Sequence, residues 1–321
     1  MGARELPGYL AVPEGEGPWP GVVIVFEAMG ANDDMRAQAD RFAAHGYLAV
    51  LPDLYDGAPW VRCVTKAMRD MRAQRGPTFD HIEAARAWLA GRDDCTGGVG
   101  VCGFCMGGGF ALVAAAKYDF EAAAANYGIL PRRPEESLRG ACPIVGSYGA
   151  ADPSLRGAAG RLERALTAAG VTHDVKEYPG TGHGFLTDLT PPPPFGPIAK
   201  IVMGFGKGRE NAPDGWSRIL AFFGEHLAKN LQRKGAGPVS PTRASRAIPS
   251  SRMTRRISHF APFVGHRIAP SRVSPETPAE HQASHIRIHR SVTGSNTGET
   301  TSCASSFCSP RPPPASPRPR P

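Results

Sequence analysis

Short apolar runs alternate with helical patterns over most of the chain. The run at residues 21–26, Gly-Val-Val-Ile-Val-Phe, is continuous and β-branched, which is typical of a strand buried on both faces. A helical pattern follows it as far as His45, and Asn32 or Asp33 can cap that helix. The same alternation predicts strands at residues 8–13, 47–55, 99–102, 122–127, 142–148 and 171–178, and helices at residues 80–89, 153–169 and 213–231. It indicates an α/β protein with a mostly parallel sheet covered by helices on both faces.

Two stretches depart from this alternation. Residues 190–208 contain Pro-Pro-Pro-Pro-Phe-Gly-Pro and several glycines, and we expect an ordered loop or lid there. From about Gly235 the chain is rich in Ser, Pro, Arg and Thr, so it offers too little apolar surface to offset the entropy lost on ordering. We therefore predict one folded domain at residues 1–233 and a disordered basic tail at residues 234–321.

The positive charge of the chain is confined to that tail. The net charge is +8, and residues 234–321 carry 13 Lys and Arg against 3 acidic side chains. The predicted domain is therefore slightly acidic, and the overall charge does not indicate an anionic substrate. The tail has no recognition module and no interleaved aromatic residues, which argues against a nucleic-acid partner. An interaction protein that acts through this tail is one alternative function.

Targeting signals and cysteine usage favour the cytoplasm. The N-terminal residues contain no apolar signal-peptide core, and no apolar run approaches the roughly 18 residues that cross a bilayer. The seven cysteines are an odd number with irregular spacing, which argues against a disulfide framework. We expect a cytoplasmic protein without a membrane partner, in a reducing compartment that keeps a reactive thiol reduced.

The stretch Gly103-Phe104-Cys105-Met106-Gly107 is the strongest candidate for chemistry. It lies between a predicted strand and a helical run rich in Ala, which is the setting of a nucleophile elbow. Such a turn needs small residues on both sides, and the helix N-terminus that follows favours a thiolate. Cys105 is therefore the candidate nucleophile. The alternative is a small apolar side chain in a glycine-rich turn.

A candidate acid and a candidate base follow later strands. Asp152 comes after the strand at 142–148, and His183 comes after the strand at 171–178. Ligands bind at the carboxyl ends of parallel strands, so both side chains are expected near Cys105. Each has a simpler interpretation, a helix cap for Asp152 and a loop residue for His183. The chain order nucleophile, acid, base is that of the α/β-hydrolase triad. In it Asp152 would orient His183, and His183 would take the thiol proton or hold a thiolate–imidazolium pair.

Together these motifs resemble the dienelactone hydrolase family of α/β-hydrolases. The similarity rests on Gly-Phe-Cys-Met-Gly-Gly, Gly-Ala-Ala-Asp, Gly-Thr-Gly-His-Gly-Phe and the early loop Phe-Glu-Ala-Met-Gly-Ala-Asn, and it spans residues 6–231. It implies an α/β-hydrolase fold and hydrolysis of a small-molecule ester or lactone through an acyl-thiol intermediate, without metal or cofactor. It also implies that Glu27 hydrogen-bonds the resting thiol, although Glu27 could instead be a solvated loop residue. We expect the backbone N–H groups of Ala28 and Met106 to form the oxyanion hole.

One departure from the family bears on the substrate. Family members that act on dienelactone hold the substrate carboxylate with arginines, one of them a few residues after the histidine. This chain has Gly184-Phe185-Leu186-Thr187 in that place. Arg62, Arg69, Arg72 and Arg75 lie where another clamp could sit, and none can be aligned with it. The resemblance therefore implies an ester or lactone hydrolase but does not specify its substrate. A non-catalytic ligand-binding relative is the other alternative function.

Overall fold

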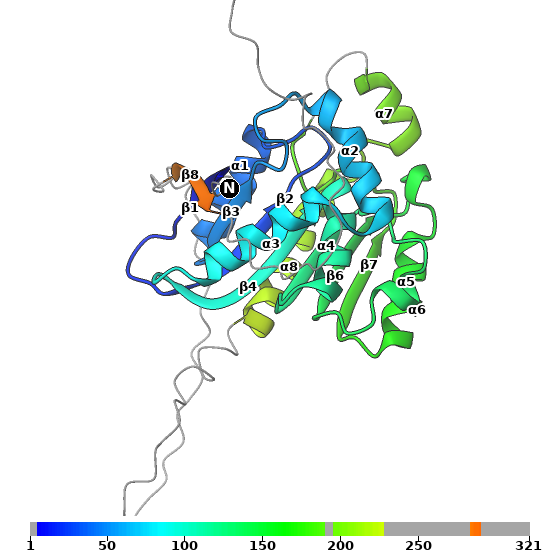
Figure 1. Cartoon of the computed structure of the whole chain (residues 1–321). Helices are drawn as coiled ribbons and strands as arrows, with labels where there is room; N and C mark the ends of the chain where they lie inside the picture. Colours follow the sequence, from blue (N-terminus) through cyan, green and yellow to red (C-terminus); the bar gives the residue numbers. More distant parts are fainter. Residues whose placement is uncertain (1–4, 190–194, 228–282, 290–321) are drawn as a thin grey trace, which may run out of the picture.

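The computed structural model describes residues 5–189, 195–227 and 283–289. Its centre is one sheet with the strand order β7-β6-β5-β4-β2-β3-β1-β8 (Figure 1). Neighbouring strands from β7 to β3 run parallel, whereas β1 pairs antiparallel with both β3 and β8. The predicted α/β-hydrolase class, a mostly parallel sheet with helices, is confirmed.

The strands form where the sequence has its continuous apolar runs. Every residue of β3, β5 and β6 is buried, as expected for parallel strands that are covered on both faces. The strands are β1 (Glu5–Ala11), β2 (Trp19–Val25), β3 (Leu48–Pro52), β4 (Cys95–Phe104), β5 (Ala122–Asn126), β6 (Ile144–Gly149) and β7 (His173–Tyr178). Because parallel strands share an orientation, the loops that follow β2 to β7 meet at one edge of the sheet.

Helices cover both faces of this sheet (Figure 1). On one face α1 (Asp33–Ala44) and α8 (Ala212–Leu227) pack against each other, since Phe42 of α1 contacts Trp216 of α8. On the other face lie α2 (Trp60–Ala73), α3 (Pro77–Ala90) and α4 (Met106–Lys117). The helix α6 (Ala158–Ala169) packs against β6 and β7, and the short α5 (Pro134–Ser137) packs against α6. None of the helices in the described residues is long and apolar enough to cross a membrane.

The helix predicted at residues 153–169 is broken in two. A 3-10 turn, η1 (Pro153–Leu155), ends before Gly157, whose φ of 68° interrupts the helical path. The helix α6 begins after it. The break separates Asp152 from the long helix and leaves it as the cap of a short turn.

Two further helices differ from the sequence-based expectation. The segment 190–208, predicted as a loop or lid, contains α7 (Phe195–Met203), while residues 190–194 lie outside the described residues. A 3-10 turn, η2 (Arg209–Asn211), follows it. The predicted elements do not include α2, although this helix is amphipathic and turns Ala67 and Met71 toward the protein.

Residues 283–289 correct the prediction of disorder for the whole tail. They form β8 (Ala283–His289), which pairs with β1 along its full length, from Glu5 opposite His289 to Ala11 opposite Ala283. The side chain of Ile288 is fully buried. The rest of residues 234–321 lies outside the described residues, so disorder there, the domain boundary at residue 233 and the cytoplasmic location stay predictions.

We expect truncation after residue 233 to lower the melting temperature by about 5 °C while leaving turnover nearly unchanged. Burial of one Ile contributes about 1.5–3 kcal/mol, and 1 kcal/mol corresponds to about 2–4 °C in a domain of this size. Thermal unfolding of the full chain, the truncated chain and Ile288→Ser measures the effect. Equal melting temperatures for all three would contradict a stabilising contact between β8 and β1.

Candidate active site

Cys105 occupies the tip of a tight turn between β4 and α4. Its φ of 54° lies in a region that favours glycine, and its N–H donates to the carbonyl of Asn126 at 3.0 Å. The turn closes because its neighbours lack side chains. A Cβ at Gly103 would collide with the carbonyl of Gly107, and a Cβ at Gly107 would collide with the carbonyl of Val25. The local sequence thus places the thiol at the carboxyl edge of the sheet, on the N-terminus of α4.

His183 and Asp152 meet at the same edge. Nδ1 of His183 lies 2.6 Å from Oδ2 of Asp152, and both residues are at most 2% exposed. The second oxygen of Asp152 accepts bonds from the N–H and the hydroxyl of Ser154, at 2.9 and 2.6 Å. The predicted acid is therefore also a cap, and the capping bonds fix the orientation in which it holds the imidazole.

The side chain of Cys105 affects the pKa of this imidazole. Burial lowers the pKa of His183, but the charge of Cys105 and the hydrogen bond with Asp152 outweigh burial and raise the pKa to about 10. Nε2 of His183 is buried and has no hydrogen-bond partner within the described residues. Asp152 on one side of the imidazole and Cys105 on the other thus both favour its cationic form.

Glu27 is a buried residue at the end of β2, and the interpretation as a solvated loop residue is wrong. Its Oε1 accepts hydrogen bonds from the hydroxyls of Thr187 and Tyr127, at 2.9 and 3.4 Å. Its Oε2 is buried and has no partner in the described part of the chain. Burial raises the pKa of Glu27 to about 7, against the opposing charge of His183. The hydrogen bonds of the described residues do not include one between Glu27 and Cys105, so that contact stays a prediction.

The backbone N–H groups of Ala28 and Met106 are available to a ligand. Neither donates a hydrogen bond to another group in the described residues. The N–H of Met106 opens α4 and belongs to the donors that a helix leaves unpaired. Tyr55 links the two residues, since its hydroxyl donates to the carbonyl of Ala28 at 3.0 Å and lies 3.9 Å from Sδ of Met106. Two donors on fixed backbones are what an oxyanion hole requires.

Similarity to known proteins agrees with this geometry. The model of the dienelactone hydrolase family matches residues 6–227. The chain belongs to the dienelactone hydrolase family. It is a hydrolase of that family, and the resemblance found in its motifs is confirmed.

Relatives of the chain carry provisional names from the same family. A protein from Yersinia pestis, provisionally named carboxymethylenebutenolidase, is 30% identical over 244 residues that cover 69% of this chain and 84% of its own. A protein of the same provisional name from Methylorubrum extorquens is 29% identical over 238 residues, which cover 69% and 77%. A crystal structure provisionally described as a dienelactone hydrolase from Klebsiella pneumoniae is 27% identical, with a TM-score of 0.57 over 69% of this chain and 93% of that chain.

Three hydroxyl-bearing residues outside the predicted set lie at this candidate site. The hydroxyl of Tyr55 donates to the carbonyl of Ala28, and those of Tyr127 and Thr187 donate to Glu27. The ring of Tyr127 lies 4.9 Å from the imidazole of His183. Tyr55 follows β3, Tyr127 follows β5 and Thr187 follows β7. The rule that identified the acid and the base, a polar residue shortly after a parallel strand, therefore also applies to Tyr55 and Tyr127, whereas Thr187 lies further along the loop that contains His183.

The pair Cys102 and Cys105 has Cys-x-x-Cys spacing, but its two thiols differ in environment. Cys102 is fully buried in β4, where burial raises the pKa of its thiol and the amide of Asn126 donates to the sulfur at 3.5 Å. A thiol in such surroundings is an inert core residue. The described residues contain no cluster of three or more potential metal ligands. Of the pair, only Cys105 is in a position to react.

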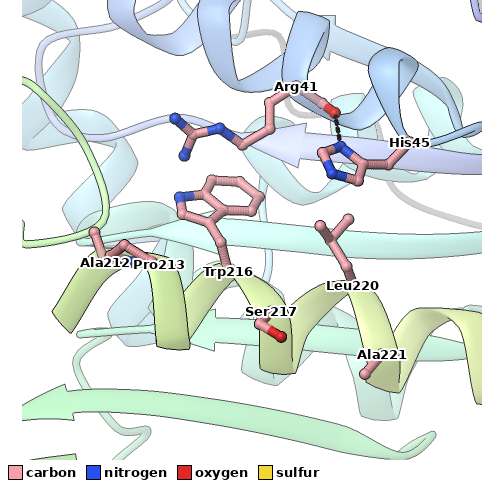
Figure 2. A pocket seen from close by; sticks show the side chains of 8 residues that line it. All are labelled: Arg41, His45, Ala212, Pro213, Trp216, Ser217, Leu220 and Ala221. Atoms are coloured by element: carbon pink, nitrogen blue, oxygen red, sulfur yellow. Dashed lines mark hydrogen bonds between the residues drawn. The ribbon is translucent and has the colours of Figure 1, made fainter. Parts of the chain in front are cut away.

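A groove between α1 and α8 is distinct from this site (Figure 2). It has a volume of about 630 Å³, and in it the guanidinium of Arg41 lies 4.6 Å from the ring centroid of Trp216. The lining residues are Arg41, His45, Ala212, Pro213, Trp216, Ser217, Leu220 and Ala221. Because neither the thiol nor the acid–base pair lines this groove, we do not assign the reaction to it.

We expect Tyr55→Phe to lower kcat about tenfold with little change in KM, because the loss of its hydroxyl loosens donors that act on the transition state. Steady-state hydrolysis of an aryl ester measures both constants. Tyr9→Phe is the matched control. It removes a phenol hydroxyl that donates to Asp40 at 2.8 Å and lies away from the thiol. A change in KM alone would mean that Tyr55 serves substrate binding and does not position the oxyanion donors.

Proposed function

We propose that this protein hydrolyses small carboxylic esters or lactones with Cys105 as the nucleophile. The observation that carries the proposal is the buried pair of His183 and Asp152, 2.6 Å apart, beside a thiol on a nucleophile elbow. Membership of a hydrolase family and the provisional names of the relatives support the same chemistry.

Acylation uses every part of this arrangement. The thiolate sulfur of Cys105 attacks the carbonyl carbon, and the N–H groups of Ala28 and Met106 stabilise the negative charge on the oxygen. As the tetrahedral intermediate collapses, the C–O bond to the leaving group breaks and His183 donates its proton to the alkoxide. The products are an acyl-thioester on Cys105 and an alcohol, which in a lactone stays attached to the acyl group.

Deacylation reverses the roles of the same residues. Neutral His183 accepts a proton from a water molecule, and the resulting hydroxide attacks the thioester carbonyl. The C–S bond breaks, the carboxylic acid leaves, and the thiolate of Cys105 is again paired with the imidazolium. Asp152 stabilises the cationic imidazole in both steps.

Glu27 acts in this proposal as a gate on the resting thiol. An ionised carboxylate near a thiol raises the thiol pKa and so opposes thiolate formation. Because the pKa of Glu27 is about 7, this opposition grows as the pH rises through 7. When substrate binds, the unpartnered Oε2 accepts the thiol proton and leaves the thiolate of Cys105 paired with the imidazolium. After deacylation Glu27 returns this proton to the thiolate, which restores the resting thiol.

We expect Cys105 to be alkylated by iodoacetamide faster in Glu27→Gln than in the unchanged protein. The difference is small below pH 7, where Glu27 is protonated, and reaches its full size above pH 7, where only the unchanged protein carries the opposing charge. Ester turnover falls in the variant if Glu27 is a proton acceptor. Mass spectrometry of the Cys105 peptide gives the rates, and Glu163→Gln on α6 is the control. Superimposable pH profiles would contradict a contact between Glu27 and the thiol.

A panel of aryl esters and unsaturated lactones tests the proposed function as a whole. We expect hydrolysis of at least one ester by the purified protein and loss of that hydrolysis after alkylation of Cys105. A folded protein that binds members of the panel without hydrolysing them would favour the non-catalytic ligand-binding alternative.

A further inference from the structure

The two oxygens of the Glu27 carboxyl have different surroundings. Its Oε1 accepts a hydrogen bond from the hydroxyl of Thr187 at 2.9 Å and a longer one from the hydroxyl of Tyr127 at 3.4 Å. Thr187 is 3% exposed and Glu27 is 2% exposed, so both groups are shielded from water. The other oxygen, Oε2, is buried and has no partner in the described part of the chain. Within that part, the shorter of the two bonds that hold this carboxyl therefore comes from Thr187.

The residues on either side of Thr187 are bonded to two helices. The indole N–H of Trp216 on α8 donates to the carbonyl of Leu186 at 3.0 Å. The N–H of Asp188 donates to the carboxylate of Asp34 on α1 at 2.9 Å. The backbone at Thr187 is therefore held from outside its own loop, and this fixes the place from which its hydroxyl reaches the carboxyl.

This asymmetry determines where the carboxyl of Glu27 binds a proton. A protonated carboxyl group has one carbonyl oxygen, which accepts hydrogen bonds, and one hydroxyl oxygen, which carries the proton. The hydroxyls of Thr187 and Tyr127 both donate to Oε1, so Oε1 is the carbonyl oxygen of the protonated form. The proton then lies on Oε2, the atom without a partner among the described residues.

We propose that Thr187 is a positioning residue for Glu27, which it holds by Oε1 so that a proton enters and leaves the carboxyl at Oε2. This inference rests on the proposed function and names how the thiol is regulated at the same site. When substrate binds, the S–H bond of Cys105 breaks and an O–H bond forms at Oε2, while the electron pair stays on the sulfur. The reverse transfer follows deacylation and restores the resting thiol.

The hydrogen bond from Thr187 also favours the ionised form of Glu27. Burial raises the pKa of Glu27 to about 7 against the opposing charge of His183, and the hydroxyl of Thr187 opposes the rise as well. The titratable groups that act on Glu27 or on its direct contacts lie on α1, on the elbow, after β5 and after β7. They are Asp34, Cys105, Tyr127 and His183. Because a hydrogen bond to a carboxylate stabilises its charge, loss of the Thr187 hydroxyl should raise the pKa of Glu27 further.

Infrared spectroscopy of the full chain tests the inference on the carboxyl itself. The C=O stretching band of protonated Glu27 is identified by its loss in Glu27→Gln. A hydrogen bond to the carbonyl oxygen lowers the frequency of this band, so we expect Thr187→Val to move it to higher frequency. The pH at which half of the band has disappeared should rise by about one pH unit, as the loss of a hydrogen bond to a charged group implies.

Three further variants separate the hydrogen bond from the space that Thr187 fills. Thr187→Ser keeps the hydroxyl and should keep both the frequency and the midpoint. Thr187→Ala removes the hydroxyl and should shift both in the same direction as Thr187→Val. Thr167→Val is the matched control, because it makes the same substitution on α6, where the hydroxyl donates to the carbonyl of Glu163 at 2.8 Å. It should leave the frequency and the midpoint unchanged.

The thiol should report the same change. In the unchanged protein, the charge of Glu27 slows alkylation of Cys105 above about pH 7 relative to Glu27→Gln. In Thr187→Val, compared with the double variant Glu27→Gln/Thr187→Val, this slowing should begin about one pH unit higher.

The outcomes separate the inference from the proposed function. An unmoved band and midpoint in Thr187→Val and Thr187→Ala would overturn the inference and leave the proposed function standing, and a lowered melting temperature alone would then assign Thr187 a structural role. Equal shifts in Thr187→Val and Thr187→Ser would overturn it as well, since packing and not the hydroxyl would be responsible. The predicted shifts in a protein that hydrolyses no ester of the panel would contradict the proposed function and leave Thr187 as the residue that positions Glu27.

Discussion

Replacement of Cys105 by Ala should lower kcat/KM for ester hydrolysis by at least about a thousandfold and leave the melting temperature nearly unchanged. A loss of this size is typical when the nucleophile of a triad is removed. The fold should persist because Ala is smaller than Cys and faces no greater strain at a φ of 54°. Initial rates on an aryl ester and thermal unfolding of the same preparations measure the two quantities.

Two further variants sharpen this result. Cys142→Ala removes a thiol just before β6, at the opposite edge of the sheet, and should keep full activity. Cys105→Ser keeps a nucleophile of similar shape, a hydroxyl. Because a hydroxyl does not ionise as a thiol does, this variant should lose most of the activity. Turnover near that of the unchanged protein in Cys105→Ala would end the interpretation of Cys105 as the nucleophile.

Replacement of Asp152 by Asn should lower kcat by about a thousandfold to ten-thousandfold. The carboxylate accepts from Nδ1 of His183, and an amide at this place stabilises neither the required tautomer nor the imidazolium. Because Asp152 helps to raise the pKa of His183, that pKa should fall in the variant, and the imidazolium that stabilises a thiolate nucleophile is then less favoured.

Asp174→Asn is the matched control for this variant. Asp174 is paired with Arg218 on the surface of β7, at 2.7 Å, so its loss removes a carboxylate without touching the triad. Alkylation of Cys105 at neutral pH should slow in Asp152→Asn and stay unchanged in Asp174→Asn. Retention of more than about a tenth of kcat in Asp152→Asn would contradict the assigned role.

The parallel strands and the contact between Asp152 and His183 could be predicted because their signals are local. A buried strand is a continuous apolar run, and the elbow is a short motif with glycines where its close contacts require them. Residues that follow parallel strands meet at the carboxyl edge of the sheet, which predicts Asp152 and His183 at one edge. The structure shows these two side chains in contact there. Tyr55 and Tyr127 also follow parallel strands closely, but nothing in the sequence distinguishes them from other loop residues.

The other elements depend on contacts that are distant in sequence. The strand β8 forms because β1 offers it a free edge. The paired residues are more than 270 positions apart, so no local sequence pattern predicts the pairing. The buried state of Glu27 depends likewise on Thr187, which follows it by 160 residues. The helix α7 lies in a proline-rich segment, where composition favours a loop, and the prolines proved to lie largely before the helix.

Trapping of the acyl-enzyme tests the central claim most directly. The protein is mixed with 4-nitrophenyl trimethylacetate, whose hindered acyl group slows deacylation, quenched in acid and analysed by intact and peptide mass spectrometry. We expect one added acyl group on the Cys105 peptide, released by hydroxylamine at neutral pH as is typical of a thioester. An acyl group on another residue, or turnover of the ester without any acylated Cys105, would contradict it.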